Sequence, residues 1–141
     1  MQEMNPDYRY QKLWLAIGYT LVMLVVYYSV ITNPPAPGAG ITKVYKAVHL
    51  QAYFDKSNHL LAYFVLMAWF AQIYHVRKQR IICALSFIAL GVTLELIQSL
   101  EPGRKLELAD MVANSSGVMV AYLVTRLSVF RLMLLRVESY I

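Results

Sequence analysis

The stretch LWLAIGYTLVMLVVYYSVI, residues 13–31, contains 19 residues and no charged side chain. About 20 apolar residues in an α-helix span the hydrocarbon core of a bilayer, which is roughly 30 Å thick. Trp14 lies near one end of this stretch, and Tyr27 and Tyr28 lie near the other, where aromatic rings favour the membrane–water interfaces. The stretch therefore predicts a transmembrane helix that remains in the mature protein as an anchor.

Three further apolar runs predict three more spans, over residues 60–76, 81–100 and 106 to about 125. A proline- and glycine-rich segment, 32–40, separates the first two spans, because proline cannot continue a helix. Residues 41–56 mix apolar and basic side chains, which predicts a short interfacial helix in the first outer loop. The expected fold class is an all-α membrane protein: one domain, 1–141, with four transmembrane helices in an antiparallel bundle.

The charge pattern gives the expected orientation. Charged residues make up only 15% of the chain, against roughly 25% in soluble domains. The net charge is +5, but Lys and Arg flank the apolar runs and form no continuous basic face, which argues against a nucleic-acid partner. Eight of them lie at the two termini and around 77–80, and five lie in the other two loops. The positive-inside rule then places both termini in the cytoplasm. The oligomeric state does not follow from the sequence.

With this orientation, uncommon polar residues from separate segments meet at the outer side of the membrane. Asp55, His59 and Tyr63 share one helix face, because residues four apart lie above one another. Gly117 and Ala121 are small residues that let the fourth span pack closely. The full set of predicted ligand-binding residues is Asp55, Lys56, His59, Tyr63, Glu95, Gln98, Arg104, Asp110 and Asn114.

Two interpretations of this polar set compete. The first is a hydrogen-bonded network that only fixes helix register. Interhelical polar contacts contribute only about 0.6 to 2 kcal/mol each, and a buried unpaired ion costs more, so the set is an expensive way to hold helices together. The second, which we favour, is a ligand site: Lys56 and Arg104, with His59 as a third cation, suit an anionic lipid or the phosphate of a lipid-linked envelope precursor.

Other functions stay open as alternatives. His59, Glu95 and Asp110 are the candidate catalytic residues of a membrane enzyme that acts on a lipid phosphate or glycolipid headgroup. Against an enzyme, the sequence has no nucleophile beside a base and no glycine-rich phosphate loop. A small proton-coupled transporter would also use intramembrane Glu and His.

No cofactor is expected, and a divalent cation is the alternative. Glu95, Asp110, Asn114 and Asp55 offer hard oxygen ligands suited to magnesium or calcium, although Arg104 would repel such an ion. A transition metal is less favoured, because the other two histidines lie far from His59 in the sequence. The single cysteine, Cys83, excludes an intrachain disulfide and a thiolate cluster.

Four motifs in this order resemble the VanZ-like family of bacterial membrane proteins. They are DKSNHLLAY at 55–63, ELIQ at 95–98, PGR at 102–104 and DMVANSSG at 110–117, and the resemblance covers about 53–124. The chain departs from the family pattern at Leu94, where many members have a second acid, and at Ala121, where a second glycine is frequent.

The resemblance implies a four-helix protein of the bacterial cytoplasmic membrane. It also implies a link to glycopeptide resistance, since the founding member lowers susceptibility to teicoplanin. Leu94 weakens any mechanism that needs two adjacent carboxylates.

Overall fold

The computed structural model describes residues 9–30, 51–74, 76–100, 106–127, 136–137 and 139–140. Within these ranges the chain is helical and contains no β-strand. The four helices are α1 (Gln11–Val30), α3 (Gln51–Ile73), α4 (Arg77–Ser99) and α5 (Leu108–Val124). Two of them, α1 and α4, are long and apolar enough to cross a membrane, and α5 is a shorter apolar helix.

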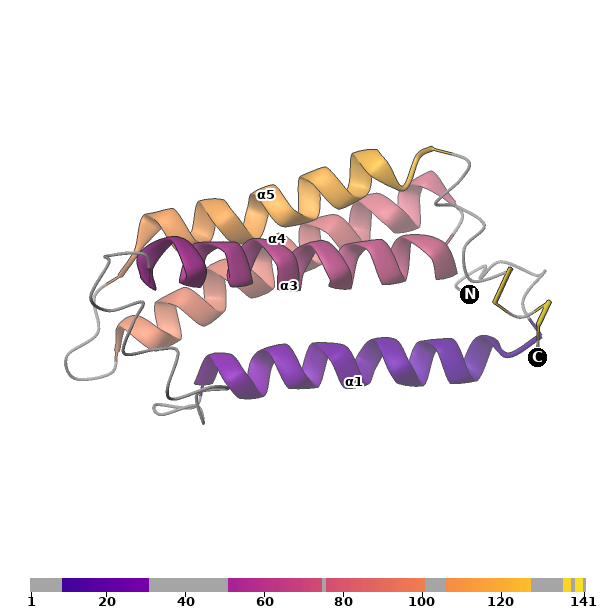
Figure 1. The fold of residues 1–141 in the computed structure, drawn as a ribbon, viewed down its shortest axis with the longest axis horizontal. Coiled ribbons are helices and arrows are strands. Elements are labelled where there is room, and N and C mark those ends of the chain that lie inside the picture. Colours follow the sequence, from indigo (N-terminus) through magenta and orange to yellow (C-terminus); the bar gives the residue numbers. More distant parts are fainter. Residues whose placement is uncertain are drawn as a thin grey trace.

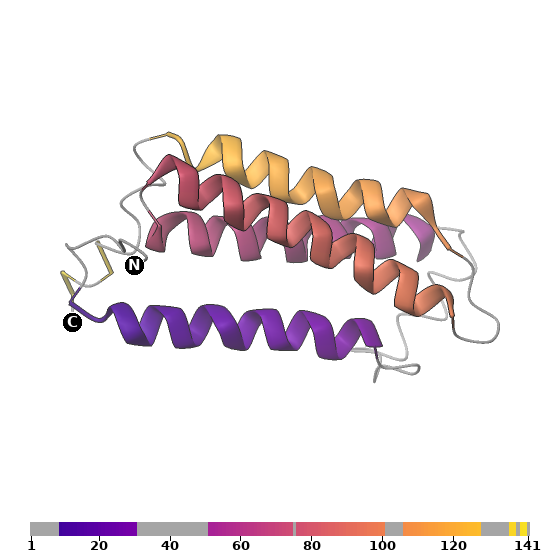
Figure 2. The same cartoon turned by 180° about the vertical axis from the view of Figure 1, so that it is seen from behind.

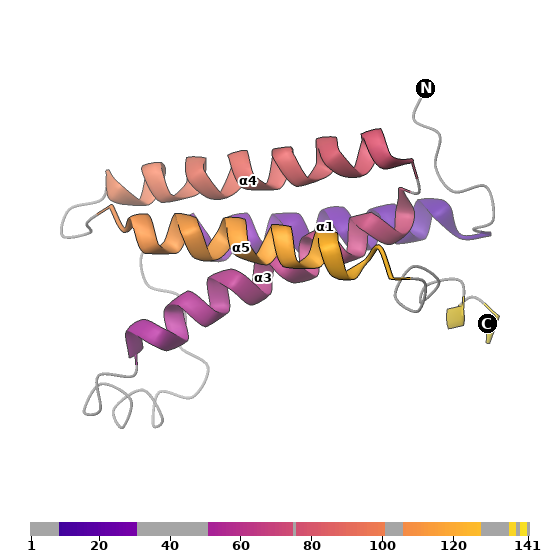
Figure 3. The same cartoon turned by 90° about the horizontal axis from the view of Figure 1, so that it is seen from above.

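The four helices lie side by side, with α1 somewhat apart from the other three (Figures 1 and 2). The last residues of α1 and α4 and the first residues of α3 and α5 lie at the same end of the molecule (Figure 1). We call this end the polar end, because the candidate site lies there. Seen from above, α3 crosses α5 at an angle (Figure 3).

The core lies where α3 meets its neighbours. Met67 and Ile73 of α3 and Val118 and Ala121 of α5 are completely buried. A side chain on Gly117 would overlap the backbone carbonyl of Leu60, so the absence of a Cβ allows α5 to approach α3 closely. Gly117 and Ala121, the small residues expected to permit close packing, therefore both lie in a tight part of the structure.

Helix α1 packs against α3 through aromatic rings. The indole Nε1 of Trp69 donates a hydrogen bond of 3.0 Å to the Trp14 carbonyl, and the two rings meet edge to face. Phe70 meets Tyr19 edge to face as well, and its ring lies against Gly18. Trp14 and Gly18 are the buried residues of α1, so most of this helix faces outward.

The helix boundaries correct three expectations. Residues 51–56, expected to belong to an interfacial helix, form the first turns of α3, and residues 41–50 of that predicted helix lie outside the described residues. The basic residues 77–80 form the first turn of α4 instead of a turn between spans. Helix α5 begins at Leu108, two residues after the predicted start. Hydropathy identifies the apolar part of a helix, but the backbone hydrogen bonds of the helix can continue into polar residues. The ends of a helix and of its apolar run can therefore differ.

Candidate functional site

Three helices each place ionisable side chains at the polar end. On α3 they lie in the first turns, on α5 at the start, and on α4 one turn before the end. On α3, exposure decreases from Asp55, which is exposed, through the half-buried His59 to Tyr63, which is buried. On α5 it decreases in the same way from Glu107 through Asp110 to Asn114. Both rows therefore lead from the surface into the core.

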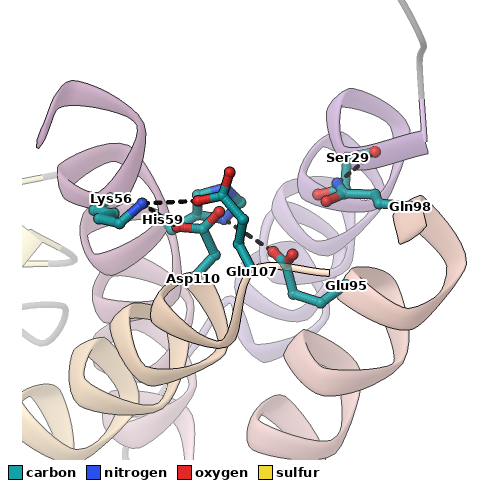
Figure 4. Close-up of polar contacts among 7 residues, drawn as sticks. All are labelled: Ser29, Lys56, His59, Glu95, Gln98, Glu107 and Asp110. Atoms are coloured by element: carbon teal, nitrogen blue, oxygen red, sulfur yellow. Dashed lines mark hydrogen bonds and ion pairs between the residues drawn. The ribbon is translucent and has the colours of Figure 1, made fainter. Parts of the chain in front are cut away.

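His59 and Glu95 face each other across α3 and α4 (Figure 4). The Nδ1 atom of His59 lies 3.8 Å from Oε1 of Glu95, and the Glu95 side chain is only 5% exposed. Hydrogen bonds between nitrogen and oxygen are usually 2.7–3.2 Å long, so the two atoms are near neighbours without a hydrogen bond between them. A carboxylate this deeply buried is costly to ionise unless a positive charge lies close to it.

Asp110 completes a cluster with these two residues. One potential ligand atom from each of His59, Glu95 and Asp110 lies within 4.8 Å of the other two. Asp110 is 9% exposed and lies in the first turn of α5, where the positive end of the helix dipole favours a carboxylate. We call these three residues the triad. The sequence predicts that these three segments meet at one depth, and their side chains lie close together in the structure.

Lys56 bridges two carboxylates at the rim of the triad (Figure 4). Its Nζ lies 3.0 Å from Oε2 of Glu107 and 3.2 Å from Oδ1 of Asp110. The hydrogen bond to Glu107, with a contribution from Asp110, raises the pKa of the Lys56 ammonium above its ordinary value. The sequence interpretation missed Glu107, although its position three residues before Asp110 puts it on the same helix face.

Asp55 lies at the outer edge of this group. Partial burial is the main cause that raises the pKa of its carboxyl group, and the nearby Asp110 carboxylate adds to the effect. His59 and Lys56 oppose it. Asp55 is exposed, so it belongs to the mouth of the site and not to its base.

Beneath the triad lies a layer of buried polar groups one helical turn deeper. Tyr63 and Asn114 are both only 2% exposed. The Tyr63 hydroxyl and the Asn114 Oδ1 have no hydrogen-bond partner within the described part of the chain. Gly91 of α4 lies against both side chains, and a Cβ there would come within 3.0 Å of Asn114 and 3.3 Å of Tyr63. This close packing brings α3, α4 and α5 together below the triad.

Two further predicted site residues are Gln98 and Arg104. Gln98 donates a 2.6 Å hydrogen bond from Nε2 to the Ser29 carbonyl, so its amide contacts α1 (Figure 4). Arg104, the predicted phosphate-binding residue, lies outside the described residues.

The opposite end contains a buried polar contact that the sequence interpretation did not expect. Arg80, interpreted from the sequence as a topology signal or lipid headgroup contact, is only 8% exposed. Its Nη2 donates a 2.6 Å hydrogen bond to Thr125 Oγ1, and its guanidinium lies over the Tyr122 ring. Tyr122 also receives a hydrogen bond from Arg126. Arg80 therefore ties α4 to the end of α5.

The balance of charge at the polar end is negative among the residues that the structure describes. Asp55, Glu95, Glu107 and Asp110 provide four carboxylates, and Lys56 is the one lysine that pairs with them. Such an arrangement attracts cations and, with His59 beside Glu95, can also hold or transfer a proton. No known protein family, curated protein or solved structure matches this chain.

Proposed function

We propose that this chain is a multi-pass protein of the bacterial cytoplasmic membrane, with its four helices in an antiparallel bundle. Its polar end, in this proposal, binds the phosphate-bearing headgroup of an anionic lipid or a lipid-linked envelope precursor. The apolar helices α1 and α4 support the membrane location. Large apolar side chains that point outward support it too, among them Met23, Leu85 and Val112, which are all more than 60% exposed. Such a surface suits lipid better than water.

The convergence of His59, Glu95 and Asp110 from three helices carries the proposal of a binding site. Ionisable groups within a membrane protein are expensive, and they usually line a pathway or a ligand site. If the triad only fixed the helix register, its groups would be expected to hydrogen-bond one another. The Nδ1 atom of His59 and the Oε1 atom of Glu95 are instead 3.8 Å apart, too far for a hydrogen bond between these two atoms.

The phosphate is the expected headgroup feature because of the neighbouring cations. Lys56 lies at the mouth of the site, and Arg104 and Lys105 come shortly before α5 in the sequence. Arg binds phosphate with two parallel hydrogen bonds, which gives both energy and orientation. The VanZ-like motifs support a binding site at the polar end, since all four include or flank its residues. The same resemblance suggests a link to glycopeptide resistance.

The orientation in this proposal places both termini in the cytoplasm and the polar end on the outer side. The distribution of Lys and Arg supports it. A cysteine introduced at position 38, in a Cys83→Ala background, should react with a membrane-impermeant maleimide in intact cells, and one introduced at position 3 should not. The reverse pattern would contradict the orientation.

Native mass spectrometry of the detergent-purified chain tests the binding function. We expect a co-purified phosphate-containing lipid on the unaltered chain and its loss in Arg104→Ala. Arg77→Ala is the matched control, because Arg77 is an exposed arginine at the start of α4, at the opposite end. Equal lipid retention in both variants would contradict the proposed site.

A membrane enzyme is the second candidate, and the pairing of His59 with Glu95 is the observation that favours it. A buried carboxylate beside an imidazole can pass a proton to or from a reacting group. Incubation of the chain with radiolabelled lipid phosphates would release a labelled product if the site is catalytic, and Glu95→Gln would abolish the release. Absence of any product would leave the binding function.

A further inference from the structure

We infer that His59, Glu95 and Asp110 bind one divalent transition-metal ion of the zinc class. This ion supplies the positive charge that faces the ligand phosphate. Its role at the phosphate rests on the proposed function, whereas the existence of the ion site does not. Sequence alone offers little support for such an ion, because His59 lies far from the other histidines along the chain and the carboxylates that face it cannot be read from spacing.

The geometry of the triad fits a shared ion. Zinc lies about 2.0–2.2 Å from nitrogen and oxygen ligands in a tetrahedral arrangement, which puts two ligands of one ion about 3.3–3.6 Å apart. The His59 Nδ1 and Glu95 Oε1 atoms are 3.8 Å apart, which is close to this separation and beyond hydrogen-bond distance. The ligand atoms of the whole triad lie within 4.8 Å of one another. Side-chain rotations that move the more distant atoms by about 1 Å would bring all three to the separation of zinc ligands.

The chemistry of the donors selects the class of ion. Magnesium and calcium prefer oxygen ligands alone, whereas zinc and its neighbours in the first transition row accept imidazole nitrogen together with carboxylates. The predicted oxygen-only set of Glu95, Asp110, Asn114 and Asp55 is not the set that the structure assembles. His59 takes the place of Asp55, which remains at the exposed edge.

Unpaired polar groups beneath the triad provide a second, independent observation. The Tyr63 hydroxyl and the Asn114 Oδ1 are buried without a hydrogen-bond partner in the described ranges. Tyr63 lies one turn below His59 and interacts electrostatically with Glu95, and Asn114 lies one turn below Asp110. Buried polar groups are nearly always paired. A hydrated ion bound by the triad would give both groups a partner, either the ion itself or its bound water.

The charge of the described residues at the polar end also favours a cation. Four carboxylates lie at the polar end, and Lys56 neutralises only part of their charge. Lys56 is held by Glu107 as well as by Asp110, so Asp110 can turn an oxygen toward the ion while the lysine stays paired.

Metal titration of the full-length chain tests the ion site. The chain is purified in detergent without a histidine tag, stripped with EDTA and titrated with Zn²⁺ alone by calorimetry. We expect one ion per chain and an affinity at least tenfold lower in His59→Ala, Glu95→Gln and Asp110→Asn. The matched controls His49→Ala and His75→Ala remove the other two histidines of the chain and should bind Zn²⁺ like the unaltered protein. No saturable binding, or equal loss in the controls, would overturn the site.

A measurement on the unaltered chain guards against variants that fail to fold. X-ray absorption at the zinc edge should show one imidazole nitrogen, with oxygen as the remaining ligands. Two or more imidazoles, or oxygen ligands alone, would overturn the assignment to the triad.

Lipid retention before and after EDTA treatment separates this inference from the proposed function. Loss of the lipid on chelation and its return with Zn²⁺ would support both. Retained lipid with no Zn²⁺ binding would overturn the ion site and leave the proposed function standing. Zn²⁺ binding by a chain that holds no phosphate lipid would overturn the proposed function and leave the ion site. Zn²⁺ binding with lipid retention unaffected by EDTA would overturn the role of the ion at the phosphate.

Discussion

Gly117 of α5 lies directly against the backbone carbonyl of Leu60 of α3, the residue that follows His59. The backbone has little freedom to move there, since Tyr63 and Val118 on either side are completely or almost completely buried. This contact sets the distance between the helices that carry His59 and Asp110. The geometry of the triad therefore depends on a glycine that bears no chemical group of its own.

We expect Gly117→Ala to lower the free energy of unfolding by about 1–2 kcal/mol, because overlap in a packed interface outweighs the gain in helix propensity. Gly18→Ala is the control, since the atoms near its Cβ belong to the rings of Phe70 and Trp69 and not to backbone. Thermal unfolding in detergent measures both. If Gly117→Ala were no worse than Gly18→Ala, the close approach of α3 and α5 would be wrong.

Thr125→Val should destabilise the protein by about 1–3 kcal/mol, because it leaves the buried Arg80 guanidinium without this hydrogen-bond acceptor. Thr93→Val is a matched control: both hydroxyls donate to the carbonyl four residues earlier, but Thr93 is exposed. We expect a change within about 0.5 kcal/mol for Thr93→Val. Similar melting temperatures for the two variants would show that Arg80 does not depend on Thr125.

Gln98→Ala should loosen the end of α1 and leave Zn²⁺ binding unchanged. The amide of Gln98 holds the Ser29 carbonyl, and its removal should lower stability by about 0.5–1.5 kcal/mol. Hydrogen exchange in the last turn of α1 should become faster, while exchange in α5 should not. A tenfold loss of Zn²⁺ affinity in this variant would instead return Gln98 to the ligand site.

Lys56→Met should raise the affinity for Zn²⁺ several-fold, because the ammonium competes with the ion for Asp110. Lys78→Met, which removes an exposed lysine at the opposite end, should leave the affinity unchanged. Calorimetric titration of both variants gives the comparison. Weaker Zn²⁺ binding in Lys56→Met would indicate that the lysine supports the ion site instead of competing with it.

The pH dependence of the Lys56 contacts has a definite sign. The folded state raises the pKa of Lys56 above the ordinary lysine value of 10.5, so the ion pair contributes its full stability below that pH. The contribution is lost only as the pH rises through the folded-state pKa. Thermal unfolding of the unaltered chain and of Lys56→Met should therefore differ by a constant amount between about pH 6 and 9. A difference that vanishes within this range would contradict the pairing of Lys56 with Glu107.

The helices and the depth of the triad were predictable because they depend on local patterns. Apolar runs mark helices, and a spacing of four residues puts Asp55, His59 and Tyr63 on one face. Helix ends were less predictable. Residues 51–54 and 77–80 form the first turns of α3 and α4, but they are too polar for hydropathy to assign them to these helices. Membrane location and ligand identity remain predictions.

Contacts between helices were the other limit. Gln98 has the spacing of a site residue, but the rotation of α4 turns its amide toward Ser29. Arg80 lies in a basic run typical of a membrane interface, and only the position of Thr125, 45 residues later, makes its burial possible. Local spacing gives the face of a helix, and the neighbour that meets this face depends on tertiary packing.

Two polar contacts of α1 with its neighbouring helices lie close to its two ends, at Trp14 and at Ser29. A slip of this helix along its axis by one turn, about 5.4 Å, would break both at once. Helix α1 therefore has a single axial register against α3 and α4. In the proposed bilayer, Tyr27 and Tyr28 would anchor the end of α1 at the membrane interface. Because α1 has one register against α3 and α4, this anchoring would also set the depth of the triad below the lipid headgroups.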